Sequence, residues 1–417
     1  MNKKIGRIFK GDKVIWMVFF FLCMISIVEV FSASSGLTYK SQNYIGPIAY
    51  HALTIAFGAA ITIITLNIPC RYFKLMTPFL MLITGLMLLI VALGGGESTN
   101  DASRWIRIGP ITIQPSEIAK GTIVLVVAQI LSAMQNEKGA DRNAFKWIMW
   151  ITIPACLLIG LENLSTAALL FAVVFLMMFI GLVPMQQLAR LAAVIIVFGV
   201  FVISTVMIVG HDKSQEEQEV AKVEQVDQPK KKKTKIEKFL HRADTWKARI
   251  LNFGKDDVSP QEYDLDKDAQ VAHANIAIVS SGVIGKGPGK STERDFLSQA
   301  FSDFIFAIVI EELGIIGAAV VVFLYIILLY RCARIASRCE NNFPAFLAMG
   351  LGLLLVIQAT FNMMVAVGLA PVTGQPLPLI SKGGTSTIIN CAYIGAILSV
   401  SRSAKMKKEE NIKSNVR

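Results

Sequence analysis

The sequence predicts an all-α membrane protein, a polytopic bundle of about ten transmembrane helices. Of its 417 residues, 54% are hydrophobic and only 17% are charged, and the mean hydropathy is +0.56. Soluble domains carry about 25% charged residues. Ten apolar runs come close to the ~20 residues that a helix needs to cross a bilayer. They fall at about 14–34, 44–67, 75–95, 115–134, 147–162, 166–184, 190–210, 303–330, 345–366 and 386–401, and the fifth is short.

The distribution of Lys and Arg predicts how this bundle is oriented. With a cytoplasmic N-terminus, the inner loops and ends of the chain hold 20 Lys and Arg, whereas the short outer loops hold four, Lys40, Arg104, Arg107 and Lys382. Because positive charge concentrates on the cytoplasmic side, we expect both termini inside the cell and an uncleaved first helix. The single membrane domain 1–417 then has a large outer loop at 211–302 and a basic cytoplasmic tail at 402–417. The net charge of +11 reflects this topology and requires no nucleic acid partner.

Three carboxylates stand in the eighth apolar run, at Asp303, Glu311 and Glu312. A charge at bilayer depth costs roughly 2.5 kcal/mol or more, so an acid there indicates function. On a helix, Glu311 lies about 12 Å deeper than Asp303, whereas two carboxylates that share a reaction centre lie roughly 5 to 10 Å apart. We therefore expect one acid to carry any chemistry. Glu29 is expected to reach the interface or a local partner, and His51 to be a satisfied interfacial histidine.

The outer loop before the fourth run combines cations with a regular polar pattern. Arg104 and Arg107 lie on either side of Trp105, and Pro115 suits the first turn of a helix. Beyond it, polar residues recur at three-residue spacing and so share one helix face; they are Gln114, Glu117 and Lys120. This face, under a basic rim, could hold a pyrophosphate-linked lipid head group. The alternative is an internal salt bridge between Glu117 and Lys120 that only locks helices together.

Three further segments have unusual composition. The lysine-rich run at 230–235 lies in a charged stretch that is typical of a solvated linker. The stretch 269–289 is apolar and rich in glycine, and it is too short and broken to span, so we expect a re-entrant or surface-lying element. The stretch 362–386, with three prolines, indicates an ordered irregular segment over a cavity. The six cysteines show no metal-ligand spacing and are expected to be reduced and structural.

Four blocks of this sequence together resemble the SEDS family, the polytopic glycosyltransferases that polymerise peptidoglycan from lipid II. They span most of the chain in the family's order, and the similarity is greater to the cell-division member than to the elongation member. The blocks are 104–106 with 114–120, 276–289, 302–306 with 311–314, and 371–386.

The resemblance implies a reaction and a set of residues. Asp303 matches the acid at the family's proposed catalytic centre, and we expect it to act as general base toward the acceptor sugar hydroxyl. Cations that stabilise the leaving pyrophosphate are expected among Arg104, Arg107, Lys120 and Arg249. A divalent cation, Mg or Mn, could share that role, although no all-protein metal site is visible in the sequence. The remaining expected substrate-binding residues are Trp105, Gln114, Ser116, Glu117, Lys286, Thr385 and Ser386.

The resemblance also implies partners. Lipid II is the expected substrate, held with its lipid in the bacterial inner membrane. A class B penicillin-binding protein, which is a transpeptidase, and other division proteins are expected to associate with the chain, together with membrane lipid, at the division septum.

Two positions depart from the family pattern, and other functions stay open. Asn163 stands where the family has an Asp, and Lys382 stands where a Tyr is usual. A flippase that transports lipid II would place functional charges through the membrane depth, whereas here they concentrate at the outer side. A scaffold that only recruits the transpeptidase would not need Asp303 in the membrane. An elongation-type polymerase is the alternative to a division role.

Overall fold

A computed structural model shows how the chain is arranged in space. It describes residues 9–41, 46–99, 102–108, 111–137, 139–209, 269–297 and 302–415. The lysine-rich run at 230–235 and Arg249 lie outside the described residues.

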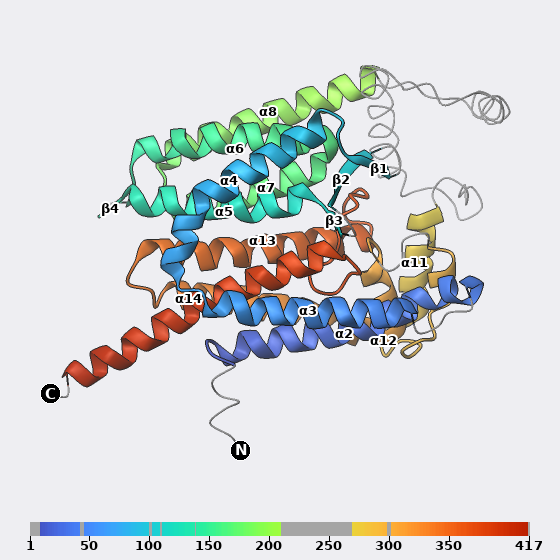
Figure 1. Ribbon diagram of the computed structural model, residues 1–417. Coiled ribbons are helices and arrows are strands. Elements are labelled where there is room, and N and C mark those ends of the chain that lie inside the picture. Colours follow the sequence, from blue (N-terminus) through green and yellow to red (C-terminus); the bar gives the residue numbers. More distant parts are fainter. Residues whose placement is uncertain are drawn as a thin grey trace.

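Ten helices correspond to the ten predicted runs and form one bundle in which most axes share a direction (Figure 1). They are α2 (Lys13–Ser41), α3 (Gly46–Asn67), α4 (Cys70–Ala92), α5 (Pro115–Ala133), α6 (Arg142–Glu162), α7 (Leu164–Ile180), α8 (Met185–Val209), α12 (Ile305–Ala336), α13 (Asn342–Ala366) and α14 (Thr385–Asn415).

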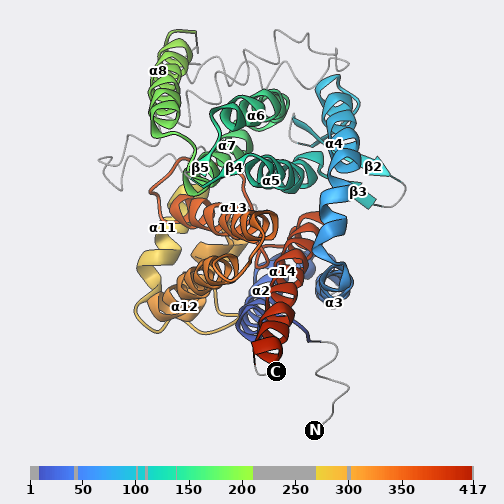
Figure 2. The ribbon, with the colours of Figure 1, turned by 90° about the vertical axis from the view of Figure 1, so that its left-hand side faces the viewer.

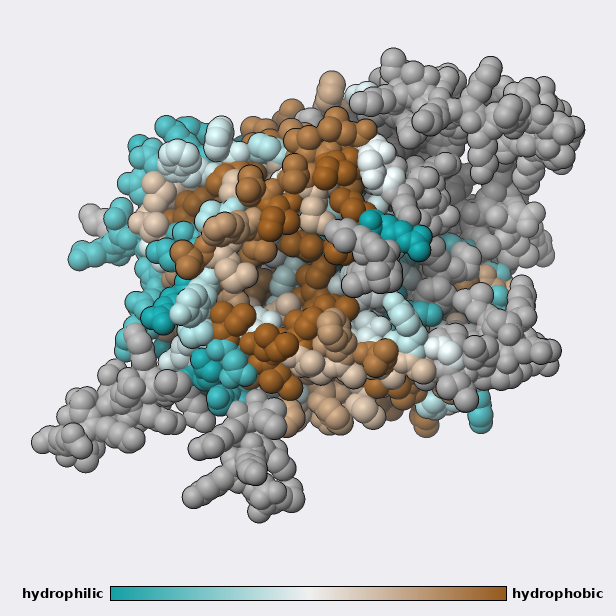
Figure 3. Space-filling model, viewed as in Figure 1, coloured by the Kyte–Doolittle hydropathy of each residue, from teal (hydrophilic) through white to brown (hydrophobic). Residues whose placement is uncertain are grey.

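Within the described part of the chain, seven helices are long and apolar enough to cross a membrane: α2, α3, α4, α5, α6, α12 and α13. Helix α7 and the apolar part of α8 are somewhat shorter. A broad hydrophobic surface covers the middle of the molecule, and hydrophilic residues gather at one end of it (Figure 3). Large apolar side chains such as Leu82, Trp150 and Val197 are exposed, as expected where lipid replaces water. The prediction of a polytopic helical membrane protein is confirmed.

The two ends of the bundle differ in structure. Helix α2 begins and α14 ends at one end, which we call the terminus end (Figure 1). The opposite end, which we call the Asp303 end, carries a three-stranded antiparallel sheet that the sequence did not predict. Its strands are β1 (Glu97–Thr99), β2 (Ala102–Ile108) and β3 (Ile111–Ile113). Helix α11 (Ala269–Ser281) also lies at the Asp303 end, across the bundle direction (Figure 1), in line with the surface-lying element expected there.

A second, very short hairpin lies at the terminus end, where β4 (Gln135–Asn136) pairs with β5 (Gly139–Ala140). Which side of the membrane each end faces stays a prediction from the charge distribution.

Short polar side chains begin several helices. Asp12 accepts a hydrogen bond from the backbone N–H of Val14 (2.8 Å) at the start of α2, and Asp141 accepts one from Asn143 (2.7 Å) at the start of α6. Such caps satisfy N–H groups that have no partner within the helix. Helix α6 therefore starts at Arg142 and has 21 residues, so the predicted short fifth span is wrong. The predicted span began only at 147 because Arg142 and Lys146 interrupt the apolar pattern at the start of this helix.

Helix α12 differs from the predicted span 303–330 in two ways. It begins at Ile305, so Asp303 lies in the preceding turn and not in the helix. It is also broken at Gly314, whose φ of 69° and ψ of −171° are not helical. The predicted depth of Glu311 below Asp303 assumed that both acids lie on one helix, and this assumption is wrong because only Glu311 lies in α12.

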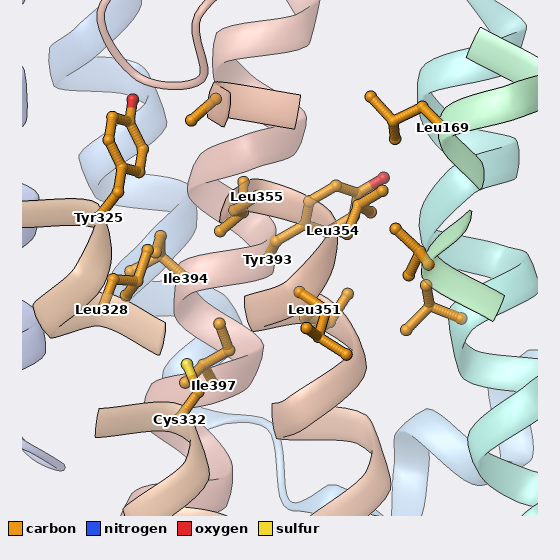
Figure 4. Packing of buried hydrophobic residues seen from close by; sticks show 14 of the residues in the cluster. Leu169, Tyr325, Leu328, Cys332, Leu351, Leu354, Leu355, Tyr393, Ile394 and Ile397 are labelled. Carbon is orange, nitrogen blue, oxygen red and sulfur yellow. The ribbon is translucent and has the colours of Figure 1, made fainter. Parts of the chain in front are cut away.

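The core of the bundle is built around α13, which lies between α5 and α7 on one side and α12 and α14 on the other (Figure 2). Tyr325 and Leu328 from α12, Leu354 from α13 and Ile394 from α14 meet in one buried layer (Figure 4). A Cβ atom at Gly352 would lie 2.7 Å from the sulfur of Cys332, so a small residue is required for α12 and α13 to approach this closely. All six cysteines are free thiols in this structure.

Candidate functional site

Asp303 lies in a tight turn that is fixed on both sides. Its carboxylate is half-buried, and Oδ1 accepts a hydrogen bond from the Ser302 hydroxyl (2.9 Å). Its backbone carbonyl accepts from Nδ2 of Asn362 (2.8 Å), and the carbonyl of Ser302 accepts from the Ser381 hydroxyl (2.6 Å). These two donors come from α13 and from the segment after it. The turn is therefore held by parts of the chain that follow α12.

The second part of the site is the segment 367–384, which we call the proline loop. A Cβ atom at Gly374 would lie 3.5 Å from Oδ2 of Asp303, so the loop passes directly beside the carboxylate. The Gln375 side chain donates to the Thr166 hydroxyl on α7 (2.7 Å). Four backbone carbonyl groups of the proline loop accept hydrogen bonds from side chains of the helices. The carbonyl of Gln375 accepts from Asn362 (2.8 Å), and that of Pro376 accepts from Gln358 (3.0 Å). The carbonyl of Pro378 accepts from Tyr325, and that of Ile380 accepts from Ser26 (2.7 Å). The loop is irregular but ordered, as expected.

The predicted pair of Glu117 and Lys120 is confirmed. Lys120 Nζ lies 2.8 Å from Glu117 Oε1, and both side chains are almost fully buried on α5. Lys120 also donates to Oε1 of Gln358 (2.6 Å). The Tyr393 hydroxyl from α14 bridges the backbone of the same turn, since it donates to the carbonyl of Glu117 (2.5 Å) and accepts from the N–H of Gly121 (3.0 Å). Lys120 thus reaches the proline loop through Gln358, and it is closed off from solvent.

The expected basic rim lies on the small sheet at the Asp303 end. Strand β2 carries Arg104, Trp105 and Arg107. Trp105 is half-buried and Arg107 is exposed, whereas the side chain of Arg104 lies outside the described part of the structure.

Gln114 and Ser116 line a small cavity of about 20 Å³ together with Glu162 and Asn163. This space is sufficient for about one water molecule. It lies where the first turn of α5 meets the junction between α6 and α7. The structure therefore brings two of the predicted binding residues together with the junction at which the sequence departs from the family pattern.

The other predicted binding residues make local contacts. Lys286 forms an ion pair with Glu311 (2.6 Å) and keeps about a quarter of its side chain exposed. Thr385 begins α14, and the Ser386 hydroxyl donates to the carbonyl of Gly383 (3.0 Å). Whether any of these residues contacts a substrate stays a prediction.

Two polar residues near the first two helices have different outcomes. His51 is buried, and its Nε2 lies 2.8 Å from the Ser26 hydroxyl, so the expectation of a satisfied histidine is confirmed. Glu29 is fully buried, and among the described residues neither of its carboxylate oxygens has a hydrogen-bond partner. Within the described residues, the expectation that Glu29 reaches the interface or a local partner is therefore wrong; helices α3 and α12 both pack against α2.

An apolar cleft of about 270 Å³ opens on the side of the bundle. It lies between α4 and the group of α5, α13 and α14, and its lining includes Phe73, Met76, Leu125, Leu351 and Tyr393. Among the described residues, no group of three or more His, Cys, Asp or Glu side chains is placed to hold a metal ion. A divalent cation therefore stays a prediction.

Comparison with known proteins identifies the family. Residues 12–406 match the FtsW/RodA/SpoVE family, which is described as cell cycle proteins. The chain belongs to this family.

Relatives of this chain within the FtsW/RodA/SpoVE family carry two kinds of name. A probable peptidoglycan glycosyltransferase FtsW from Aromatoleum aromaticum is 30% identical over 391 residues, which cover 91% of this chain and 85% of the relative. Another from Geobacter metallireducens is 28% identical over 398 residues, covering 94% and 95%. The peptidoglycan glycosyltransferase MrdB of Escherichia coli is 27% identical over 398 residues, covering 95% and 94%.

Two solved structures have a similar fold. A chain from a study of polymerization and crosslinking by a peptidoglycan synthase complex superposes with a TM-score of 0.69 at 21% identity, covering 94% of this chain and 98% of that chain. The rod shape determining protein RodA of Thermus thermophilus superposes with a TM-score of 0.61 at 20% identity, covering 94% and 97%.

The two positions that were expected to depart from the family pattern lie in different surroundings. Asn163 ends α6 and begins α7, and its side chain accepts from the N–H of Thr166 (3.3 Å). An amide oxygen performs this capping task as well as a carboxylate does. Lys382 is half-buried at the end of the proline loop, and burial lowers the pKa of its ammonium group below the ordinary value.

The residues that hold the turn of Asp303 and the proline loop beside it were not predicted from the sequence. Gln358 and Asn362 lie four residues apart on one face of α13, inside an otherwise apolar run. Their helical spacing could have indicated this role, because polar side chains inside a membrane span need hydrogen-bond partners within the protein. Gln375 carried no comparable signal, since it lies in a loop and its partner Thr166 is distant in the sequence.

Proposed function

We propose that this protein is a peptidoglycan glycosyltransferase that polymerises lipid II, with Asp303 as the general base. The observation that carries the proposal is the placement of Asp303. Its carboxylate is half-buried at one end of a membrane bundle, while its backbone is fixed by Asn362 and, through Ser302, by Ser381. A catalytic group must be held by its surroundings in this way. The names of the relatives, which describe peptidoglycan glycosyltransferases, support the same reaction class.

In the proposed reaction, a sugar hydroxyl of one lipid-linked disaccharide attacks the anomeric carbon of another. The Asp303 carboxylate accepts the hydroxyl proton as the new glycosidic bond forms. The bond to the lipid pyrophosphate breaks at the same carbon with inversion, and the pyrophosphate leaves with the electron pair. Asp303 then returns its proton to solvent, and its partial exposure allows this step.

The leaving pyrophosphate needs positive charge near it. Exposed Arg107 and its neighbour Arg104 on β2 are the proposed source, with Arg249 and Lys286 as further candidates, and Trp105 supplies an apolar surface beside them. Gln114 and Ser116 at the start of α5, together with Thr385 and Ser386 at the start of α14, are proposed to contact the head group. Glu117 and Lys120 support this face from within, because their side chains are closed off from solvent.

The apolar cleft beside α4 is proposed to hold part of the polyprenyl chain. Its lining is almost entirely apolar, and its opening on the side of the bundle gives access from lipid. A lipid chain held there would keep its head group in the membrane plane. This arrangement explains why a sugar transfer is performed by a membrane bundle.

We propose a role in cell division with a class B penicillin-binding protein as partner. Division is supported by the FtsW names of the first relatives, while the MrdB relative is almost as similar. The partner is supported by the likeness to a chain from a peptidoglycan synthase complex that combines polymerization and crosslinking. The proposed location is the inner membrane at the division septum, with both termini in the cytoplasm.

The proposal is tested with labelled lipid II and the purified chain, alone and with its transpeptidase. The expected product is a ladder of glycan strands that a muramidase degrades. Failure to polymerise in both conditions would contradict the proposal. Transport of lipid II across vesicles without polymerisation would assign the protein to the transporters.

A further inference from the structure

The glycine-rich loop 282–292 fills the break in α12. Because Gly314 is not helical, carbonyl groups before it lose their partners further along the helix. The loop replaces them: the N–H of Lys286 donates to the carbonyl of Glu311 (2.9 Å), and the N–H of Gly287 donates to that of Glu312 (2.8 Å). The loop therefore continues the hydrogen bonding of α12 from outside the helix.

Two glycines make this contact possible. Gly285 and Gly314 both have positive φ, at 85° and 69°. A Cβ atom at Gly285 would lie 2.4 Å from the backbone N of Gly314, and one at Gly314 would lie 2.5 Å from the backbone N of Gly285. The loop and the helix thus meet backbone to backbone, at a distance that no other residue type permits.

Two fully buried carboxylates bind the same loop from the helix side. Glu312 accepts from the N–H of Gly289 (2.8 Å), from the N–H of Ser291 (3.2 Å) and from the Ser32 hydroxyl. Glu311 accepts from Lys286 Nζ (2.6 Å), from the N–H of Thr292 (3.0 Å), and from the hydroxyls of Thr292 and Ser291. Protein donors occupy all four carboxylate oxygens of these two acids, so neither acid is available as a second catalytic acid.

We infer that Glu311 and Glu312 are positioning residues. They fix Asp303 through the helix segment that connects Asp303 to these two acids. This segment runs from Ile305 to the break, and the side chains of residues 305–312 are all buried. Asp303 stands at one end of it, and the glycine-rich loop holds the other end. A shift of the loop would therefore move the segment and the turn before it. The inference rests on the proposed general-base role of Asp303.

The two acids differ in what an amide would do in their place. In Glu312→Gln, an NH₂ group must face the N–H of Gly289 or of Ser291, so one buried donor is stranded. In Glu311→Gln, the NH₂ group can face the Ser291 hydroxyl, which is able to accept, and only the charge opposite Lys286 is lost. Glu312→Gln should therefore release the loop more than Glu311→Gln does.

Glu29→Gln is the matched control. Glu29 is also fully buried, but among the described residues its oxygens accept no hydrogen bond. The same substitution at this position removes a buried carboxyl and strands no donor of the loop. It should leave both the loop and the reaction close to the wild type.

The first measurement is hydrogen exchange of the backbone amides in 283–292, on the full chain in detergent or nanodiscs. Wild type and Glu29→Gln should protect these amides, whereas Glu312→Gln should raise their exchange by ~10-fold or more. Unchanged protection in Glu312→Gln would contradict the role of Glu312 in holding the loop. This result is independent of catalysis, so it stands or fails apart from the proposed function.

The second measurement is steady-state polymerisation of lipid II. If the loop positions Asp303, Glu312→Gln should lower kcat by up to ~10²-fold, the cost of a small misplacement, with little change in KM. Exposed loop amides together with a wild-type kcat would overturn the inference. If Glu312→Gln does not fold, Ser291→Ala tests the same loop, because it removes a hydroxyl that donates to Glu311; Ser280→Ala, at an exposed serine in α11, is its control. No polymerisation by the wild type would contradict the proposed function and leave the exchange result intact.

Discussion

Removal of Lys120 has a cost that can be worked out from the pair geometry. Lys120 is the partner of Glu117 Oε1, and Glu117 Oε2 has no hydrogen-bond partner among the described residues. In Lys120→Met, the buried carboxylate keeps no partner there, and Gln358 Oε1 loses its donor. Breaking a buried pair on one side costs roughly 3 to 5 kcal/mol. We expect this loss in the free energy of unfolding.

The double variant Glu117→Leu/Lys120→Met separates the contributions. It removes both charges, so only the stranded acceptor of Gln358 remains, which costs roughly 1 to 3 kcal/mol. Thermal unfolding of the purified proteins in one detergent should therefore place the double variant between the wild type and Lys120→Met. A double variant that is as unstable as the two single changes combined would refute the reasoning. If Lys120→Met is inactive but unfolds at the wild-type temperature, the lysine serves the substrate and not the fold.

Three further predictions concern topology, the linker and the proline loop. A cysteine at Ser214 should react with an impermeant reagent in intact cells, since 211–302 is expected outside, and protection would reverse the orientation. Deletion of 229–234 should leave polymerisation nearly intact, whereas a large loss would indicate that these lysines capture anionic lipid or the partner. Asn362→Asp places an acceptor against the carbonyl groups of Asp303 and Gln375 and should reduce polymerisation by ~10-fold or more. The control is Asn342→Asp, at an exposed position on the same helix, which should have no such effect. Equal activity of the two variants would contradict the role of Asn362.

The sequence was sufficient to predict contacts that are local along the chain. The ten helices follow from apolar runs, and the pair of Glu117 and Lys120 follows from helical spacing. His51 was also read correctly, because a lone histidine in an apolar run needs only one partner. These features depend on periodicity and on the cost of polar groups in lipid, both of which are legible in one sequence.

Contacts between distant parts of the chain could not be predicted in this way. Asn362 binds the backbone of Asp303 from 59 residues away, and nothing in either segment specifies the other. The glycine-rich loop was expected to be irregular, but its partner is a helix break that appears in the sequence only as one glycine in an apolar run. The cost of a charge in the membrane therefore indicated that Glu311 and Glu312 are important, but the sequence did not predict that they bind this loop. Glu29 was misjudged because burial depends on which helices pack over it.

The central claim is that Asp303 removes the proton from the acceptor hydroxyl. Asp303→Asn keeps the size and the hydrogen bond of the side chain but cannot accept that proton at neutral pH. Loss of a general base costs roughly 10²- to 10⁴-fold in rate, which is roughly 3 to 5 kcal/mol in the barrier. The matched control is Asp295→Asn, an exposed acid near the end of the same outer segment.

The most direct measurement is the initial rate of lipid II polymerisation by wild type, Asp295→Asn and Asp303→Asn, each purified with the transpeptidase. The account predicts equal association with the partner in all three, wild-type rates in Asp295→Asn, and a rate in Asp303→Asn lower by roughly 10² or more. A near wild-type rate in Asp303→Asn would contradict the account.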